Sequence, residues 1–264
     1  MRFDLFLVNN SYAESRQKAQ RLIKNGCVSV DGKILTKASE EIDCSIEHTV
    51  EIARTDNEKY VSRGGLKLEG ALFAFGISPK GMICADIGAS TGGFTDCLLQ
   101  NGATKVYALD SGRDQLHSSL ANDERVISKE GFNARYITPE DIGEEVDLVV
   151  MDVSFISQTM IIPSLVSLLK SGGIFVTLIK PQFEAGRSTL GKNGIVKRKE
   201  DRLSAVMRVL NSAALVGLSF EGLIKSPITG GDGNEEFLAC FRLCESIDIK
   251  RPIAAEIKRT VFGQ

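Results

Sequence analysis

Short apolar runs recur along most of the chain, and stretches with apolar residues at helical spacing lie between them. The runs are MICADIG, KVYALD, RVISK, VDLVVMDV, GIFVTLIK and FLACFRL, at residues 82–88, 105–110, 125–129, 146–153, 173–180 and 237–243. This alternation predicts a mostly parallel sheet covered by helices on both faces. Ahead of the first run, VSRGGLKLEGALFAF predicts an amphipathic helix after Gly64 and Gly65.

The amino-terminal pattern differs and predicts a small unit of mixed helix and strand. In SRQKAQRLIKNG, apolar residues repeat at helical spacing between Ser15, which can cap the helix, and Gly26, which can end it. CVSVDGKIL then alternates around Asp31 and Gly32, a strong hairpin signal.

Length and composition fit two domains with filled cores. The chain has 264 residues, of which 43% are hydrophobic and 25% charged, and domains usually hold about 100 to 200 residues. The polar segment RTDNEKY separates the two patterns. We therefore expect domains at residues 1–58 and 59–264.

Net charge excludes a uniformly basic nucleic-acid binder, because the formal value is -2. Locally, however, residues 14–24 carry four basic side chains against one acidic one. A solvated helix face explains this as readily as an RNA-binding face does. The four candidates for RNA contact are Arg16, Lys18, Arg21 and Lys24.

The sequence gives little support for a membrane segment, a metal site or histidine-based catalysis. No stretch approaches the roughly 18 apolar residues of a membrane helix, and MRFDLFLVNN lacks the features of a signal peptide, so a cytoplasmic protein is expected. The six cysteines form no CxxC pair, and only two histidines exist. Any chemistry must therefore use lysines, carboxylates and a cofactor, with no metal expected.

A glycine-rich turn follows the first strand of the larger region. In ADIGASTGGFTDCLLQNG, the glycines fall where a strand meets a helix, the place at which ligands approach the backbone in doubly wound sheets. The second strand ends in Asp110, which could accept hydrogen bonds from a ribose diol. The spacing departs from the pyrophosphate-binding GxGxxG, which favours S-adenosylmethionine (SAM) over NAD.

Two charged residues follow neighbouring strands. Asp152 comes after VDLVVM and Lys180 after GIFVTLI. Parallel strands end at the same edge of a sheet, so carboxylate and amine can converge beside a cofactor. Lys180 could accept a proton as a neutral amine, or stabilise a developing negative charge as a cation, and the sequence leaves both roles open.

These residues lie in motifs that resemble a known family. DIGASTGGFTDCLL, MDVSFISQTMIIPSL, LIKPQFEAGR and GNEEFL resemble the TlyA group of ribosomal-RNA 2'-O-methyltransferases, often called hemolysins, within the FtsJ/RrmJ-like class. SRQKAQRLIKNGCVSVDGKIL resembles the S4 RNA-binding domain. The resemblance implies an α/β class I SAM-dependent methyltransferase with a Rossmann-like seven-stranded sheet ending in an antiparallel hairpin, preceded by a small S4-like α+β domain.

The resemblance also implies roles for individual residues. A Lys-Asp-Lys-Glu tetrad would consist of Lys67, Asp152, Lys180 and Glu236; Glu235 is adjacent to the last, but the family's GNxEF or GNxEY spacing favours Glu236. The residues expected to bind the cofactor are Asp86, Gly88, Ala89, Ser90, Thr91, Gly92 and Asp110, with Phe132 or Asn133 beside the adenine. After Asp110 the chain departs from the family's Gly-Tyr-Gly-Gln run, but Gln115 and Leu116 keep their place. Arg187 and Lys192 could contact RNA phosphates or be solvated.

The expected function is SAM-dependent methylation of a ribose 2'-hydroxyl, by resemblance that of a cytidine in 16S or 23S rRNA within a ribosome or subunit. Two alternatives remain. One is a membrane-active hemolysin, for which the sequence offers no membrane-inserting segment. The other is an S4-type RNA-binding protein with an inactive methyltransferase domain, against which the complete tetrad argues.

Overall fold

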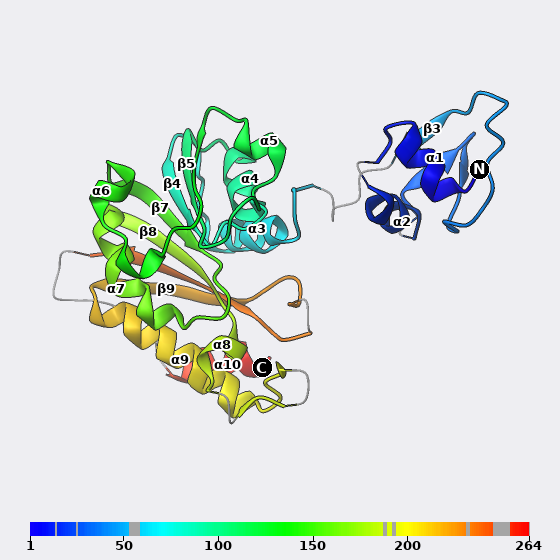
Figure 1. The fold of residues 1–264 in the computed structure, drawn as a ribbon. Helices are drawn as coiled ribbons and strands as arrows, with labels where there is room; N and C mark the ends of the chain where they lie inside the picture. Colours follow the sequence, from blue (N-terminus) through cyan, green and yellow to red (C-terminus); the bar gives the residue numbers. More distant parts are fainter. Residues whose placement is uncertain are drawn as a thin grey trace. The chain divides into compact units, whose positions relative to one another are not determined.

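The chain forms two compact units, Met1–Lys59 and Tyr60–Gln264, in the computed structural model (Figure 1). The structure describes residues 1–13, 15–24, 26–52, 59–186, 189–191, 194–230, 233–244 and 254–263. The division lies one residue beyond the expected boundary between residues 58 and 59.

The first unit contains two helices and a small antiparallel sheet. Its elements are α1 (Phe3–Asn9), α2 (Arg16–Lys24), β1 (Val28–Val30), β2 (Lys33–Ile34) and β3 (Val50–Ile52), with strand order β2-β1-β3. As predicted, Ser15 Oγ accepts a hydrogen bond from the Lys18 amide at 3.3 Å, at the start of α2. The hairpin turn is also as predicted, because Asp31 and Gly32 have φ angles of 52° and 77°.

The second unit is built on a seven-stranded sheet in the order β6-β5-β4-β7-β8-β10-β9. Its strands are β4 (Ile83–Ile87), β5 (Lys105–Leu109), β6 (Val126–Lys129), β7 (Val146–Met151), β8 (Leu169–Ile179), β9 (Leu218–Lys225) and β10 (Phe237–Leu243). β4 to β8 pair in parallel, whereas β10 is antiparallel to both β8 and β9. This confirms the predicted fold class, including the antiparallel hairpin.

Helices cover both faces of this sheet (Figure 1). One face packs against α3 (Gly64–Phe75), α4 (Gly93–Gln100) and α5 (Ser118–Ala121), and the other against α7 (Ile162–Leu165), α9 (Lys199–Leu215) and α10 (Ala254–Phe262). The short α6 (Pro139–Ile142) and α8 (Pro181–Glu184) follow β6 and β8.

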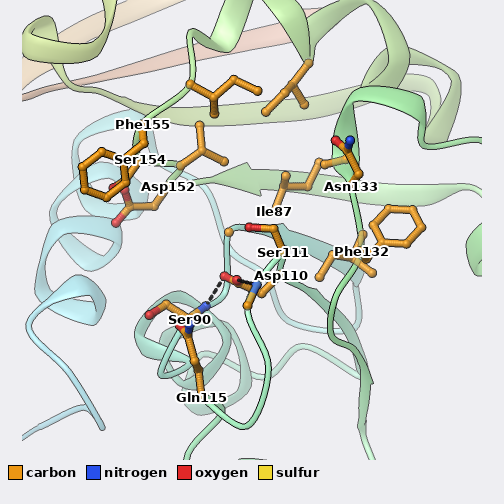
Figure 2. Close-up of a pocket in the computed structure, with 17 residues that line it drawn as sticks. Ile87, Ser90, Asp110, Ser111, Gln115, Phe132, Asn133, Asp152, Ser154 and Phe155 are labelled. Carbon is orange, nitrogen blue, oxygen red and sulfur yellow. Dashed lines mark hydrogen bonds between the residues drawn. The ribbon is translucent and has the colours of Figure 1, made fainter.

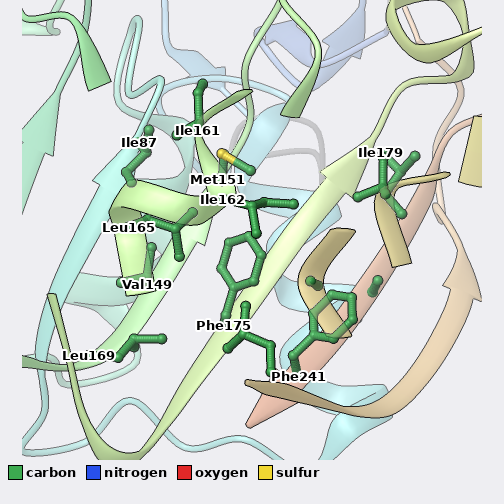
Figure 3. Close-up of a cluster of buried hydrophobic side chains, with 14 of the residues drawn as sticks. Ile87, Val149, Met151, Ile161, Ile162, Leu165, Leu169, Phe175, Ile179 and Phe241 are labelled. Carbon is green, nitrogen blue, oxygen red and sulfur yellow. The ribbon is translucent and has the colours of Figure 1, made fainter. Parts of the chain in front are cut away.

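The central strands are buried on both sides, because successive side chains point to opposite faces. On β7, Val149 and Met151 join one apolar cluster, whereas Leu148 and Val150 join the other. Figure 3 shows the first cluster, which includes Phe175 and Phe241 from neighbouring strands and Ile162 and Leu165 from α7. Burial on both faces explains the nearly continuous apolar runs in the sequence.

The structure departs from the sequence predictions in two elements. β9, with the sequence LSFEGLIK, was not predicted; it is an edge strand with an exposed Glu221 that interrupts its apolar pattern. Helix α3 begins at Gly64, so both glycines lie within it. A Cβ on Gly65 would come within 2.2 Å of the Tyr60 ring, so this close packing requires glycine.

Candidate active site

Lys180 and Asp152 meet at the carboxyl ends of β8 and β7. Lys180 Nζ lies 2.5 Å from Asp152 Oδ1 and donates a hydrogen bond to Ser154 Oγ at 2.8 Å. The Lys180 and Asp152 side chains are only 12% and 20% exposed. The convergence expected from strand ends is therefore present, and Ser154 is a contact that the sequence did not suggest.

A second ion pair joins Lys67 on α3 to Glu236 just before β10. Lys67 Nζ lies 2.6 Å from Glu236 Oε2, and both side chains are almost fully buried. The neighbouring Glu235 instead pairs with Arg202 at 3.1 Å and Lys225 at 2.6 Å. The geometry thus separates the two glutamates, with Glu236 the one that reaches Lys67.

A pocket of about 200 Å³ contains three of the four predicted catalytic side chains, Lys67, Asp152 and Lys180. Ala89, Ser90 and Thr91, from the glycine-rich turn, also line it. Glu236 does not line it, because it lies behind Lys67 in the buried pair. The pocket thus brings cationic and carboxylate groups to the end of the turn, where a polar substrate group could be held between them.

A larger pocket of about 460 Å³ adjoins the first and shares Gly88, Ser90, Asp152 and Ser154 with it. In Figure 2, Asp152, Ser154 and Phe155 lie on one side, and Phe132 and Asn133 on the other. Its volume and its mixed polar and apolar lining suit a small cofactor. Gln115, in the segment that departs from the family pattern, also lines it.

Asp110 is held rigidly at the edge of the larger pocket. Its Oδ2 accepts a hydrogen bond from the Ser90 amide at 2.8 Å, and its Oδ1 accepts one from the Gly112 amide at 2.6 Å (Figure 2). A carboxylate has about four acceptor positions, so two remain for a ligand's hydroxyl groups.

Asp86 lies beneath the glycine-rich turn rather than in the lining of either pocket. It is fully buried, its Oδ2 accepts a hydrogen bond from Thr95 Oγ1 at 2.7 Å, and its Oδ1 has no partner among the described residues. Burial raises the pKa of this carboxyl to about 7, with Asp152 and Asp110 adding to the rise and Thr95 opposing it.

The two predicted cofactor glycines have different structural roles. Gly88 lines both pockets with a φ of 86°, and a Cβ there would lie 2.5 Å from the Asp152 carbonyl oxygen. Gly92 lines neither, and a Cβ there would lie 2.3 Å from Leu120 Cδ1. Gly88 thus allows two strand ends to approach, whereas Gly92 allows the turn to pack.

Phe155 is a site feature that sequence reasoning missed. Its side chain is 91% exposed, its φ is 63°, and its ring centroid lies 5.1 Å from that of Phe183. A positive φ is rare for a bulky residue and often accompanies a functional constraint. Its position beside Asp152 in the motif MDVSF was the available signal.

The basic candidates of the first unit lie on α2. Arg16 Nε pairs at 2.9 Å with Asp4, a fully buried carboxylate that also binds Arg2 and Gln20. Hydrogen bonding from Arg2, supported by Gln20 and Arg16, holds the pKa of Asp4 well below its usual range. Lys24 is exposed and Lys18 partly so. The Arg21 side chain, Arg187 and Lys192 lie outside what the structure describes.

The described part of the chain contains no group of His, Cys, Asp and Glu side chains that could hold a metal ion. Within the same residues, no helix is both long and apolar enough to span a membrane.

Comparisons with known proteins show which families the two units resemble. The FtsJ-like methyltransferase family model matches residues 60–243, and the S4 domain model matches residues 1–43. Hemolysin A of Brachyspira hyodysenteriae is 48% identical over 247 residues, covering 91% of this chain and 99% of the relative. The 16S/23S rRNA (cytidine-2'-O)-methyltransferase TlyA of Mycobacterium tuberculosis is 44% identical over 242 residues, covering 91% and 89%.

A solved structure gives the same result. A Streptococcus thermophilus protein that carries the name hemolysin superimposes with a TM-score of 0.76 and 42% identity, covering 100% of this chain and 94% of its own. The family model spans well over half of the chain, and the relatives are similar along nearly all of it. The chain therefore belongs to the FtsJ-like methyltransferase family, in the group that TlyA and hemolysin A represent and that carries an S4 domain at its amino end.

Proposed function

We propose that this protein transfers a methyl group from SAM to the ribose 2'-hydroxyl of a cytidine in ribosomal RNA. The carrying observation is the pair Lys180 and Asp152, which lies where a cofactor-sized pocket meets a smaller polar one. The TlyA relative at 44% identity is named for this reaction on 16S and 23S rRNA. Because rRNA would be the substrate, we also propose a cytoplasmic location.

The larger pocket fits SAM. Asp110 has acceptor positions left for a ribose diol, and Phe132 and Asn133 could border an adenine. Buried Asp86 offers an unpartnered oxygen beneath the turn that would surround the methionine part. When bound, SAM would supply an electrophilic methyl group.

The residues of this chain would then orient the acceptor hydroxyl. Ser154 and Asp152 hold the Lys180 amine in one position, and Lys67, held by Glu236, lines the same smaller pocket. Lys180 would either take the hydroxyl proton or stabilise the developing alkoxide. Positioning of this kind can supply roughly 7 to 11 kcal/mol of barrier reduction in favourable cases.

RNA binding would involve both units. The α2 face of the S4-like unit could contact phosphates through Arg16, Lys18, Arg21 and Lys24, with shape rather than sequence as the main signal. In the methyltransferase unit, exposed Phe155 is suited to stack on an unpaired base beside the catalytic pair.

The test is mass mapping of 2'-O-methyl nucleotides in rRNA from cells with and without the gene, followed by methylation of isolated subunits with purified protein and SAM. We expect one or more cytidine methylations that depend on the gene. Unchanged rRNA, together with failure to bind SAM, would contradict the proposal.

Two relatives are named hemolysins, so membrane lysis is the competing function. Liposome leakage measured with the same purified protein distinguishes it. We expect no leakage at concentrations that methylate rRNA. RNA binding without methyl transfer would instead support an inactive methyltransferase domain.

A further inference from the structure

A buried hydrogen-bond network lies near the carboxyl ends of β7 and β8, which carry Asp152 and Lys180. We call these strand ends the catalytic edge. We call the network the Gln158 network, and it consists of Ser157, Gln158, Thr177 and Glu184. Gln158, Thr177 and Glu184 are at most 2% exposed, and none of the four lines either pocket. Buried polar side chains lower stability unless they are fully bonded, so a network of this size calls for a physical reason.

Gln158 connects the segment after β7 to the end of β8. Its Nε2 donates to the Leu178 carbonyl at 2.6 Å, and its Oε1 accepts from Thr177 Oγ1 at 2.9 Å. Thr177 lies opposite Met151 in the parallel β7–β8 register. The Gln158 side chain thus contacts β8 within three residues of Lys180.

Glu184 connects the same segment to the helix that begins after Lys180. Its Oε1 accepts a hydrogen bond from the backbone amide of Gln158 at 2.8 Å, and its Oε2 accepts one from Ser157 Oγ at 2.6 Å. It is the last residue of α8, and Arg208 on α9 donates to its carbonyl at 2.7 Å. Burial raises the pKa of this carboxyl, with its hydrogen bonds and Arg208 opposing the rise.

The segment between Asp152 and Gln158 is therefore held at both ends. At one end, the Asp152 amide donates to the Ile87 carbonyl of β4 at 2.9 Å. At the other end lies the Gln158 network. Between them are Ser154, which accepts from Lys180, and Phe155, with its positive φ.

We infer that Gln158 is a positioning residue for methyl transfer: with Thr177 and Glu184, it sets the separation between Lys180 and Asp152 by joining the segments that follow β7 and β8. The inference rests on the proposed function, because it assigns the network to that reaction. Apolar packing would allow the two segments to slide, whereas directional bonds to backbone groups specify one register. A displacement of about 1 Å at a catalytic group can lower the rate by about a hundredfold.

Thr177 offers a matched pair of variants. Thr177→Val removes the hydroxyl with little change of shape, whereas Thr177→Ser keeps it. We expect Thr177→Val to lower kcat about tenfold or more. The assay is run at saturating SAM and rRNA subunit, at a temperature below the melting temperature of the variant. Thr177→Ser should stay within about twofold of the parent. As a further control, Lys170→Met removes the Lys170–Asp147 ion pair. This pair lies at the amino ends of β7 and β8, away from Lys180 and Asp152, so its loss should leave kcat unchanged.

Gln158→Glu supplies a pH signature that a purely structural role would not produce. When protonated, the introduced carboxyl can donate to the Leu178 carbonyl and accept from Thr177, as the amide does. When ionised it loses that donor and faces the Leu178 oxygen without a proton between them. Because burial raises the pKa of a carboxyl, we expect kcat of this variant, relative to the parent, to fall as pH rises, and kcat of Gln158→Leu to be low throughout.

Parental kcat in Thr177→Val and Gln158→Leu, with only a lower melting temperature, would overturn the inference. If the parent itself methylates no rRNA, the proposed function fails separately. The inference is then tested by crystal structures of the parent and Gln158→Leu. It predicts a longer separation of Lys180 Nζ from Asp152 in the variant, and an unchanged separation would overturn it.

Discussion

The two lysines that line the smaller pocket, Lys67 and Lys180, have carboxylate partners but different surroundings. Lys67 and Glu236 are buried together, whereas Lys180 and Asp152 remain partly exposed: Lys180 lines the smaller pocket, and Asp152 lines both. A buried pair with one partner removed leaves an uncompensated charge, so Lys67 and Glu236 depend on each other structurally as well as chemically. Lys180 is the better test of chemistry, because it can be changed with less disturbance to the core.

Lys180→Ala should retain SAM affinity and lose methyl transfer, because Lys180 lines the smaller pocket, which we propose holds the acceptor hydroxyl, and not the larger pocket proposed for SAM. Calorimetric SAM binding and a subunit methylation assay measure the two properties. Lys105→Ala, at the opposite end of the sheet, serves as the control and should methylate normally. Methylation by Lys180→Ala at the parental rate would remove this lysine from the mechanism.

Asp86 predicts a pH dependence of stability. Its pKa is about 7 in the folded protein against 3.8 ordinarily, so the folded protein holds this proton more tightly than the unfolded chain. The free energy of unfolding therefore falls as pH rises from about 4 to about 7, and the loss is complete above that range. Asp86→Asn removes this contribution.

The measurement is chemical denaturation of the cofactor-free parent and Asp86→Asn at several pH values. We expect the stability of the variant relative to the parent to rise by a few kcal/mol across pH 4 to 7. A constant difference across this range would contradict the raised pKa.

At the level of elements, the approach of the first turn to the end of β7 depends on Gly88. Gly88→Ala adds a methyl group against the Asp152 carbonyl at a backbone φ of 86°. Strain of this kind costs about 1 to 3 kcal/mol. The added methyl group would also displace the backbone at Asp152, one of the two residues of the proposed catalytic pair. We expect a lower melting temperature together with loss of SAM binding.

Gly76→Ala is the matched control for this change. Gly76 ends α3 with a φ of 64°, but nothing lies within 4 Å of an added Cβ. Thermal unfolding should show a cost of about 1 kcal/mol from backbone strain, while SAM binding is retained. Equal SAM affinity in both variants would show that close approach at Gly88 is unimportant for the pocket.

Elements were predictable to different degrees. β4, β5, β7 and the end of β8 read clearly from the sequence because burial on both faces demands continuous apolar residues. β9 was missed because an edge strand tolerates polar residues, and its identity depends on pairing with β10. The start of β8 at Leu169 was also missed, because LKSGG contains two glycines that local propensity places in a turn.

For the whole molecule, the formal charge of -2 conceals a basic helix on the S4-like unit. Lys18→Glu with Lys24→Glu, in the full chain, should weaken binding to ribosomal subunits. The salt dependence of log K should also decrease by about 0.7 to 0.9 for each lost phosphate contact. Fluorescence titration at several salt concentrations measures both effects.

SAM affinity of this double variant should match the parent, because both changed residues lie on α2 in the S4-like unit and not in the methyltransferase unit. Lys105→Glu, with one charge reversed in the methyltransferase unit, is the comparison and should bind subunits normally. An unchanged salt slope in the double variant would exclude α2 as the RNA-binding face.

The sequence by itself determined the alternation of strands and helices, the glycine-rich turn and the order of Asp152 and Lys180, because each depends on local pattern and on the rule that parallel strands end together. Only the tertiary structure showed that Glu236 rather than Glu235 pairs with Lys67, that Asp86 is buried beneath the turn, and that Gln158 contacts β8. These facts depend on contacts between residues distant in the chain. Local propensity carries no information about them, because the packing of separate elements decides which side chains meet.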